Sequence, residues 1–237
     1  MPTFRHGKKT AVFLNATDMS PYLNDATVTR EIEANDTTTF GSTSRSYIVG
    51  MDDGGLSLSG MFDGSANASD AVLAGRILQE DNVLTVLPEG TAQGSRAILA
   101  QGDMTAYEVS MPVADVVAIS SAFQADGGVR QGYNLISDTQ TGSGTASSVD
   151  FGSAMSNGSI FHLHVTSNSN GSANTFKVQA SSNDSTFSDV ATFASVAGSA
   201  TTSERVVVTT SVNRYLRVVR TTNGTASYSY TIAAARR

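Results

Sequence analysis

The sequence predicts a mostly β protein: a β-sandwich or barrel with one flanking α-helix, followed by a second antiparallel β-sandwich. Short apolar or alternating runs, which are typical of β-strands, recur along the whole chain. Turn-forming Gly, Asn, Asp and Ser residues separate these runs. Only residues 70–80 have the spacing of an amphipathic helix. Many short strands with a single helix indicate closed or sandwiched sheets.

Length and composition limit the classes of protein that the chain can form. At 237 residues and 24.6 kDa, it has room for one large or two small domains. It has no cysteine, which excludes disulfides, thiolate metal sites and thiol nucleophiles. The apolar run from Ala11 to Leu14 is too short for a signal peptide, and no stretch has the length of a membrane span. We therefore expect a protein that folds in a cytoplasm without membrane insertion.

Charge is distributed unevenly along the chain, whose net charge is −6 at pH 7. Residues 1–134 hold 16 acidic and 8 basic residues, whereas residues 135–237 hold 5 acidic and 7 basic residues. An acidic first half argues against binding of nucleic acid through its phosphates. The acidic charge has two possible roles: it could form a surface past which DNA slides without binding, or it could simply keep the protein soluble.

The stretch that organises the first half runs from Asn35 to Phe62. It begins with a Thr/Ser-rich loop, residues 35–45, which has one aromatic residue, one arginine and no group suited to catalysis. An apolar strand at residues 47–49 and an alternating strand at residues 56–62 follow, separated by a turn at residues 50–55 that contains Asp-Gly-Gly. This sequence predicts a hairpin turn between the two strands. A long loop beside a hairpin suggests a surface that meets another subunit.

Two further elements complete the first domain, which we place at residues 1–136. Residues 26–34 alternate between two faces, as expected of an amphipathic strand. The apolar face holds Ala26, Val28, Arg30, Ile32 and Ala34, and the acidic outer face holds Thr27, Thr29, Glu31 and Glu33. The helix expected at residues 70–80 has a buried stripe formed by Leu73, Ile77 and Leu78.

The second half of the chain has a different composition. Residues 137–148 are rich in Ser, Gly and Thr, which predicts a flexible linker at the start of a second domain. The chain beyond it has few acidic residues and many Ser, Asn and Thr residues. Strands are expected at residues 160–167, 175–181, 190–196, 205–210, 214–222 and 227–233. These strands, joined by Asn-rich and Gly-rich turns, predict a β-sandwich over residues 149–237.

Candidate catalytic and metal-binding residues do not form a recognisable site. His162 and His164 share a face of a predicted strand, but no Cys or nearby acid supplies the third ligand that zinc requires. We expect these histidines to point outward or to pack against the sheet. Serines lie in turns without a Gly-x-Ser-x-Gly elbow, and acidic pairs such as Asp52 and Asp53 have no established catalytic spacing. We therefore predict no enzyme, no metal site and no cofactor.

Four arginines and one tyrosine in the last strands are candidates for ligand binding. The arginines, Arg205, Arg214, Arg217 and Arg220, do not share one strand face, so we expect solvated strand edges and no nucleic-acid surface. Tyr215 could stack on a sugar ring, with Arg217 as a second glycan contact. The alternative is that Tyr215 belongs to the core of the sandwich.

Three short patterns in the first half resemble the major tail tube proteins of long-tailed bacteriophages. They are a Thr-Thr-Phe-Gly loop at residues 38–41, a Tyr-Ile-Val-Gly strand at residues 47–50 and a Leu-Ser-Leu-Ser-Gly-Met-Phe-Asp strand at residues 56–63, read after residues 18–23. The resemblance implies a structural protein of the virion tail, assembled in the host cytoplasm. In that family, six-membered rings stack into a conduit for DNA ejection.

The resemblance also implies partners and an interface. The partners are identical copies, other tail proteins such as the tape measure and the tail terminator, and DNA that passes through the lumen without specific binding. The residues expected at the subunit interface are Thr37, Thr38, Thr39, Phe40, Arg45 and Tyr47.

The second sandwich is similar to accessory domains of phage tail proteins, which resemble galactose-binding modules. We expect a galactose-binding-like or an immunoglobulin-like sandwich. We expect it on the outside of the tube. The alternative is a carbohydrate-binding adhesin or decoration protein, in which the second sandwich binds host surface glycans and the first domain is the attachment module.

Overall fold

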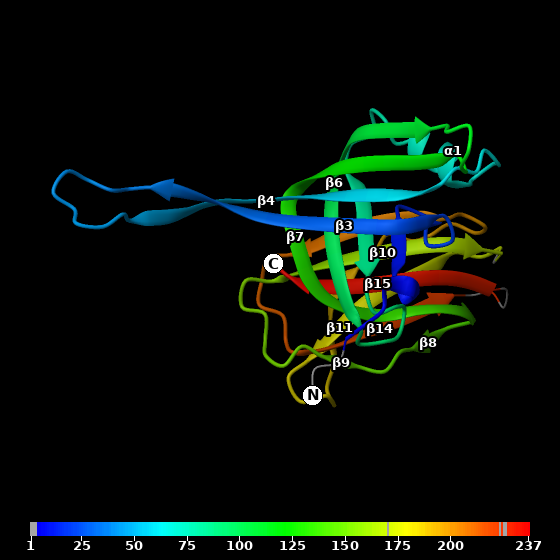
Figure 1. Ribbon diagram of the computed structural model, residues 1–237. Coiled ribbons are helices and arrows are strands. Elements are labelled where there is room, and N and C mark those ends of the chain that lie inside the picture. The colour runs from blue at the N-terminus through cyan, green and yellow to red at the C-terminus, as the bar shows by residue number, and fades with distance from the viewer. Residues whose placement is uncertain (1–3, 170, 223, 225–226) are drawn as a thin grey trace. The chain divides into compact units, whose positions relative to one another are not determined.

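The computed structural model describes residues 4–169, 171–222, 224 and 227–237 (Figure 1). The described chain is almost entirely antiparallel β-structure, with one α-helix. The mostly β class predicted from the alternating runs is therefore confirmed. No helix within these residues is both long enough and apolar enough to span a membrane.

The elements have the following bounds. The short elements of the first half are the 3₁₀-helix η1 (Gly7–Lys9), β1 (Ala11–Leu14), β2 (Thr17–Asp18), α1 (Ser69–Ala74) and β5 (Asn82–Leu87). The long strands are β3 (Leu23–Asp36), β4 (Tyr47–Met61), β6 (Arg96–Ser110) and β7 (Ala118–Thr141). The remaining strands are β8 (Gly144–Thr145), β9 (Val149–Asp150), β10 (Ser159–Asn168), β11 (Asn174–Ser181), β12 (Ser188–Thr192), β13 (Thr202–Val208), β14 (Tyr215–Thr222) and β15 (Ser227–Arg236).

The chain forms two compact units that do not follow the order of the sequence. Unit 1 comprises Met1–Pro21, Val83–Leu99 and Arg130–Arg237, and unit 2 comprises Tyr22–Asn82 and Ala100–Val129. Strands β6 and β7 each contribute residues to both units. A boundary at residue 136 between independently folding domains stays a prediction.

Residues 137–148, expected to form a flexible linker, are largely strand. β7 continues to Thr141 and pairs with β15, from Gly132 opposite Ala235 to Thr141 opposite Ser227. Hydroxyls strengthen this pairing, since Ser137 Oγ lies 2.7 Å from Thr231 Oγ1. Ser and Thr predicted a linker by composition, but here they form cross-strand hydrogen bonds in a sheet.

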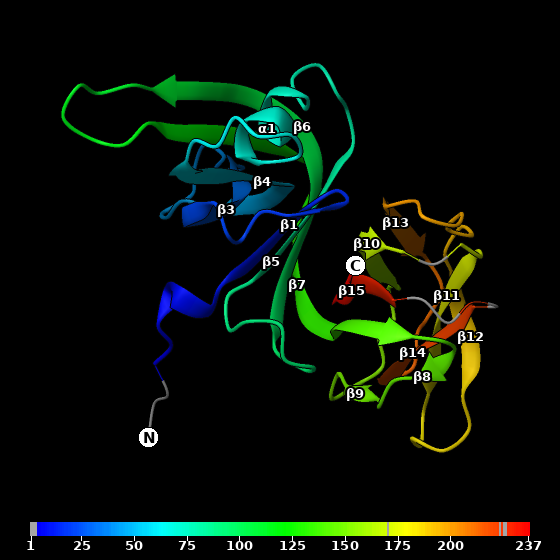
Figure 2. The same ribbon diagram turned by 90° about the vertical axis from the view of Figure 1, so that its right-hand side faces the viewer.

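Unit 1 contains a β-sandwich, seen edge-on in Figure 2. One layer has the strand order β13-β10-β15-β7, and the other has the order β12-β11-β14-β8, with β9 also paired to β14. Alternate residues of both layers form one core that includes Phe161, Leu163, Phe176, Leu216 and Ile232. The second antiparallel sandwich expected from the strand spacing is therefore present.

β10 is buried on both of its faces. Phe161, Leu163 and Val165 belong to the sandwich core, whereas Ile160, on the opposite face, belongs to a second apolar cluster with residues of β1, β5, β6 and β15. This second cluster comprises Ala11, Phe13, Leu87, Ala97, Leu99, Ile160, Ala233 and Ala235. A strand covered on both sides has no solvent face, so its polar residues must find partners inside the protein.

Unit 2 is organised around the antiparallel β3–β4 hairpin. β3 pairs with β4 from Leu23 opposite Gly60 to Asp36 opposite Tyr47. β4 pairs in turn with β7, but only from Gly55 to Met61. The buried apolar residues of unit 2 include Leu56, Leu58, Val72, Leu73, Ile119 and Phe123.

The hairpin turn lies at a different place from the one predicted. Residues 50–55 do not turn: they lie within the continuous strand β4, and the connection between β3 and β4 is residues 37–46. Gly54 allows neighbouring strands to approach closely. A Cβ atom at this position would lie 2.7 Å from both the Thr29 carbonyl oxygen and Val129 Cγ2, which is too close. A glycine required for strand packing thus resembled a turn glycine in the sequence.

The helix is shorter than expected. α1 ends at Ala74, and Ile77 and Leu78 are exposed by 45% and 93% instead of being buried with Leu73. Gly75 is the C-cap residue, and Leu78 has a φ of 67°, which a helix cannot accommodate.

Candidate subunit interface

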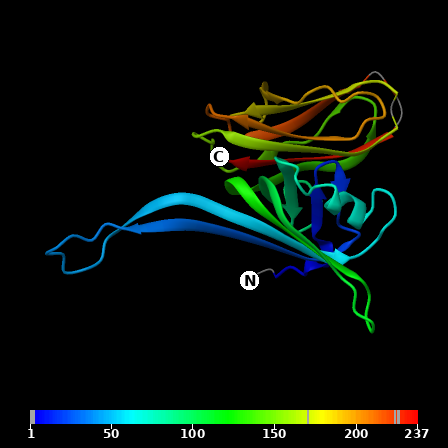
Figure 3. The same cartoon turned by 90° about the horizontal axis from the view of Figure 1, so that it is seen from above.

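The distal half of the β3–β4 hairpin is a two-stranded ribbon, which we call the arm and define as residues 30–53. β4 has a second strand partner, β7, only from Gly55 onward. Beyond that point the hairpin extends away from β7, as Figures 1 and 3 both show. A two-stranded hairpin with no third strand and no covering layer is marginally stable in water. The arm is therefore the part of unit 2 that most needs an additional contact.

One face of the arm, the inner face, continues the buried face of the unit 2 sheet. Directly paired residues on adjacent strands share a face, and Val28 pairs with Leu56, Arg30 with Gly54 and Ile32 with Asp52. A register shift follows, after which Ala34 pairs with Val49 and Asp36 with Tyr47. The inner face of the arm thus comprises Arg30, Ile32, Ala34, Asp36, Tyr47, Val49 and Asp52.

The inner face keeps its apolar residues although nothing within the described chain covers it. Leu56 is 2% exposed, whereas on the same face Ile32 is 54%, Tyr47 54% and Val49 78% exposed. Large apolar residues therefore recur on this face along the arm, but their burial stops where the arm begins. A row of large apolar side chains exposed in this way is typical of protein–protein contact surfaces.

An ion pair interrupts the apolar row at the base of the arm. An Arg30 guanidinium nitrogen lies 3.3 Å from Asp52 Oδ2, with the two side chains 45% and 24% exposed. Arg30, placed by the alternation on the apolar face, is therefore paired with an acid there. At this exposure the pair contributes little stability on its own, but it presents no unbalanced charge to a partner.

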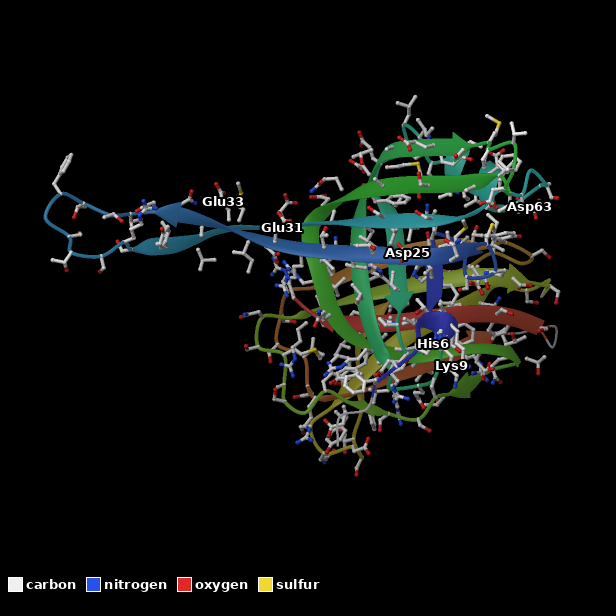
Figure 4. All side chains as sticks on the ribbon, in the orientation of Figure 1. His6, Lys9, Asp25, Glu31, Glu33 and Asp63 are labelled. Carbon is white, nitrogen blue, oxygen red and sulfur yellow. The ribbon has the colours of Figure 1, made fainter. Side chains whose placement is uncertain are left out.

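The opposite face, the outer face, is acidic. Glu31 lies directly opposite Asp53, and Glu33 follows on the same strand face, with Glu31 and Glu33 labelled in Figure 4. Asp53 Oδ1 accepts hydrogen bonds from Gln124 Nε2 at 2.5 Å and from its neighbour Gly54 N at 2.7 Å. Like charges directly opposite on adjacent strands destabilise the pairing. The acidic outer face predicted from the alternation is confirmed.

The tip of the arm, residues 37–46, is shaped by its threonines. Thr38 donates to Asp36 Oδ1 from its backbone N at 2.8 Å and from its hydroxyl at 2.5 Å. These bonds lower the pKa of Asp36 below its usual value, the side-chain bond having the larger effect. Thr37 N donates to the Ser46 carbonyl at 2.8 Å across the base of the tip. The Thr39 carbonyl accepts a hydrogen bond from Ser42 N at 3.1 Å.

The structure separates the six predicted interface residues by role. Thr37, Thr38 and Thr39 hold the tip in shape through local hydrogen bonds. Phe40 is fully exposed at the tip, and Tyr47 is half-exposed, with its hydroxyl 3.5 Å from Arg45 Nη1. Only Phe40 and Tyr47 offer apolar surface, and the contact of these six residues with another subunit stays a prediction.

Sequence reasoning did not include Ile32, Val49 and Met51 among the interface residues. Val49 and Met51 are each 78% exposed. The signal that could have identified them is the recurrence of large apolar residues in β3 and β4 on a ribbon with no third strand.

The two glycan candidates share a strand face but already have partners. The Arg217 guanidinium lies 3.8 Å from the Phe187 ring centroid, and its Nε donates to Gln179 Oε1 at 2.9 Å. The Arg214 guanidinium lies 4.7 Å from the centroid of the half-buried Tyr215 ring. A cation therefore already lies over one face of each ring. Glycan contact at Tyr215 and Arg217 stays a prediction.

Arg220 also departs from the expected solvated edge. Its guanidinium donates to the Tyr230 hydroxyl and to Gln140 Oε1, both at 3.0 Å, and to the Gly142 carbonyl at 3.1 Å. This arginine is thus a structural residue that joins β14 to β15 and to the end of β7.

His162 and His164 form a buried hydrogen-bonded chain with Thr85. His164 Nδ1 lies 2.6 Å from the Asn15 carbonyl, His164 Nε2 lies 2.8 Å from Thr85 Oγ1, and His162 Nδ1 lies 3.1 Å from the same hydroxyl. A carbonyl only accepts, so His164 Nδ1 carries the proton and the Thr85 hydroxyl donates to Nε2. Thr85 then accepts from His162 Nδ1. Both imidazoles are neutral in this arrangement.

Burial of the histidines sets their protonation. It lowers the pKa of His164 to about 4, against a smaller opposing effect of the bond to Asn15. Burial, followed by repulsion from His164 and Arg205, lowers the pKa of His162 well below its usual value. The pair is therefore packed inside unit 1. Among the described residues, no group of three or more His, Asp or Glu side chains is arranged to hold a metal ion.

Comparison with known proteins yields structural similarity only. No family model matches the chain, and no curated protein matches it. The virion of a native gene transfer agent contains a chain that is 13% identical, with a TM-score of 0.45 over 53% of this chain and 97% of that one. The tail of an empty gene transfer agent particle, which has C6 symmetry, gives 14% identity and a TM-score of 0.42 over the same fractions. The phage SPP1 tail tube gives 11% identity and a TM-score of 0.42 over 53% of this chain and 77% of that one.

Proposed function

We propose that this chain is a structural protein of a phage tail tube, whose copies associate through the arm. The observation that carries the proposal is the inner face, which keeps the apolar alternation of a sheet core while Ile32, Tyr47 and Val49 are exposed. Burial of a side chain of this size stabilises a contact by about 1.5–3 kcal/mol. In a single chain these side chains stay exposed, so this stabilisation is gained only when another surface buries them. A second copy of the same chain supplies that surface.

The resemblance of the sequence supplies the form of the assembly. Six copies close a ring, rings stack into a tube, and DNA passes through the lumen during ejection. The acidic first half of the chain would repel the DNA phosphates and so prevent binding. The carboxy-terminal sandwich is displayed on the exterior, and the tape measure and tail terminator are further partners. Assembly takes place in the host cytoplasm, and the product belongs to the virion tail.

The first test is the form of the purified chain in negative-stain electron microscopy. We expect rings or tubes above a threshold concentration. We also expect Phe40→Ala to raise that threshold roughly 30-fold, because loss of a buried aromatic side chain costs about 2 kcal/mol.

Leu78→Ala is the matched control, since Leu78 is 93% exposed and lies outside the arm. Tubes formed by Phe40→Ala at the same concentration as the wild type would show that the tip does not anchor in a neighbour. A wild-type chain that remains monomeric at high concentration would refute the proposed function itself.

A further inference from the structure

The outer face of the arm carries carboxylates that the described chain does not neutralise. Glu31, Glu33 and Asp53 lie together on this face, and Asp25 lies further along β3 on the same side (Figure 4). No described cation forms an ion pair with any of them. Asp53 and Asp25 accept hydrogen bonds from uncharged groups: Gln124 Nε2 donates to Asp53, and the Thr27 hydroxyl, at 3.3 Å, donates to Asp25. The strand pairing thus holds Glu31 and Asp53 opposite each other without a compensating charge.

Four basic residues lie close together at the start of the chain, within residues 5–9. Arg5, His6, Lys8 and Lys9 are all exposed. Only Arg5 has an acidic neighbour, Glu89, with Arg5 Nε 3.5 Å from the carboxylate and the arginine side chain 63% exposed. The third lysine of the chain, Lys177, is already paired with Asp189 at 2.6 Å. Lys8 and Lys9 are therefore the lysines available to a partner.

The basic segment has a defined shape. Residues Gly7–Lys9 form the 3₁₀-helix η1, and the Lys8 backbone N donates to His6 Nδ1 at 3.1 Å. The Thr10 backbone N donates a hydrogen bond to the Gly7 carbonyl at 2.8 Å, which closes the turn. The turn holds Lys8 and Lys9 next to each other, so the segment presents concentrated positive charge to a partner.

We propose that the outer face of the arm binds the basic segment Arg5–Lys9 of a second copy of the chain. The inference rests on the proposed function, since it names the surface that meets one face of the arm during self-association. Three cations, Arg5, Lys8 and Lys9, face three carboxylates, Glu31, Glu33 and Asp53. A cation placed between Glu31 and Asp53 relieves the repulsion that the strand register imposes.

This pairing fixes the type of contact. The two surfaces differ, so each copy has one acidic and one basic surface, and the interaction is head-to-tail. Head-to-tail contacts close into rings or propagate along an axis, whereas two copies of one surface form only a dimer. Complementary charges of this kind determine which surfaces meet and how fast, and they are weakened by salt.

Charge reversal in the full chain tests the proposal. One variant carries Glu31→Lys and Glu33→Lys, and the other carries Lys8→Glu and Lys9→Glu. Each alone is expected to weaken self-association at least tenfold in sedimentation velocity at low salt. An equimolar mixture is expected to recover the wild-type association, because every contact then joins a reversed arm to a reversed segment, or a native arm to a native segment. The matched control is Glu80→Lys with Glu108→Lys, which makes the same charge change at two exposed positions of unit 2.

The outcomes separate this inference from the function on which it rests. Loss of association in each variant with recovery in the mixture supports the pairing between copies. Variants that associate as the wild type does would overturn the pairing and leave the proposed function standing. Loss without recovery in the mixture would also overturn it, because the charges would then act within one chain. A wild type that does not associate would overturn both.

Discussion

Replacing Ile32 and Val49 together by aspartate is expected to abolish self-association while leaving the fold of the monomer intact. Both side chains are more than half exposed, so the monomer loses little on their replacement. In an assembled form, the two changes remove about 4 kcal/mol of apolar burial and place charge in an apolar contact. Association should therefore weaken by roughly a thousandfold or more. Sedimentation velocity measures the association, and thermal unfolding monitored by circular dichroism measures the fold.

The matched control for this variant is Val207→Asp, a single exposed valine on β13 in unit 1. We expect it to assemble normally. Assembly of the Ile32→Asp/Val49→Asp variant at the wild-type concentration would show that the inner face is not a contact surface. A variant that fails to fold would show that the arm stabilises the monomer, which its exposure argues against.

The second large effect is a loss of stability in mild acid that originates at His162 and His164. Their folded pKa values lie below the value of about 6.5 typical of an unfolded chain. The unfolded state therefore binds protons that the folded state does not, and the free energy of unfolding falls as the pH is lowered from about 6.5. For His164, with a pKa of about 4, the loss reaches roughly 3 kcal/mol at pH 4. His162 adds to this loss in the same direction.

Urea denaturation at pH 7.5 and at pH 5 measures this effect, because carboxylates titrate little in that range. Nuclear magnetic resonance of the imidazole nitrogens gives an independent readout, and we expect both rings to be neutral, with the proton on Nδ1, at pH 6. An imidazole of either residue that titrates near pH 6.5 in the folded protein would contradict the buried arrangement.

The fold class could be predicted from the sequence, and so could the residues that share each face of a strand. The assignment of Arg30 and Ile32 to one face of β3, and of Glu31 and Glu33 to the other, follows from a period of two and holds in the structure. The strand-rich second half was also predictable, since its turns are marked by Asn and Gly. These features depend on residues close together in the chain.

Features that depend on distant segments could not be predicted in the same way. His162 and His164 alternate with apolar residues, as they would on a solvent-facing strand, but their face packs against residues of β1 and β5. Gly54 resembles a turn glycine and instead lies where two strands approach. Residues 137–141 have the composition of a linker and instead pair with β15. In each case a partner far away in the sequence determines the structure.

The sequence pointed to the tip of the arm but not to the whole apolar face of the arm. The Thr-rich loop and Tyr47 identified the region, and the structure adds Ile32 and Val49. Their importance depends on knowing that β7 stops pairing with β4 at Gly55. No local pattern reveals where a third strand ends.

The most direct test asks whether the inner face becomes covered when the chain assembles. The chain has no cysteine, so Val49→Cys introduces a single thiol, and Glu80→Cys provides a control thiol outside the arm. The rate of thiol alkylation is measured for each variant at concentrations below and above the assembly threshold. We predict that the thiol at position 49 reacts at least tenfold more slowly in the assembled form, whereas the thiol at position 80 is unaffected. Equal reactivity at position 49 in the monomer and in the assembled form would contradict the claim that identical copies cover the arm.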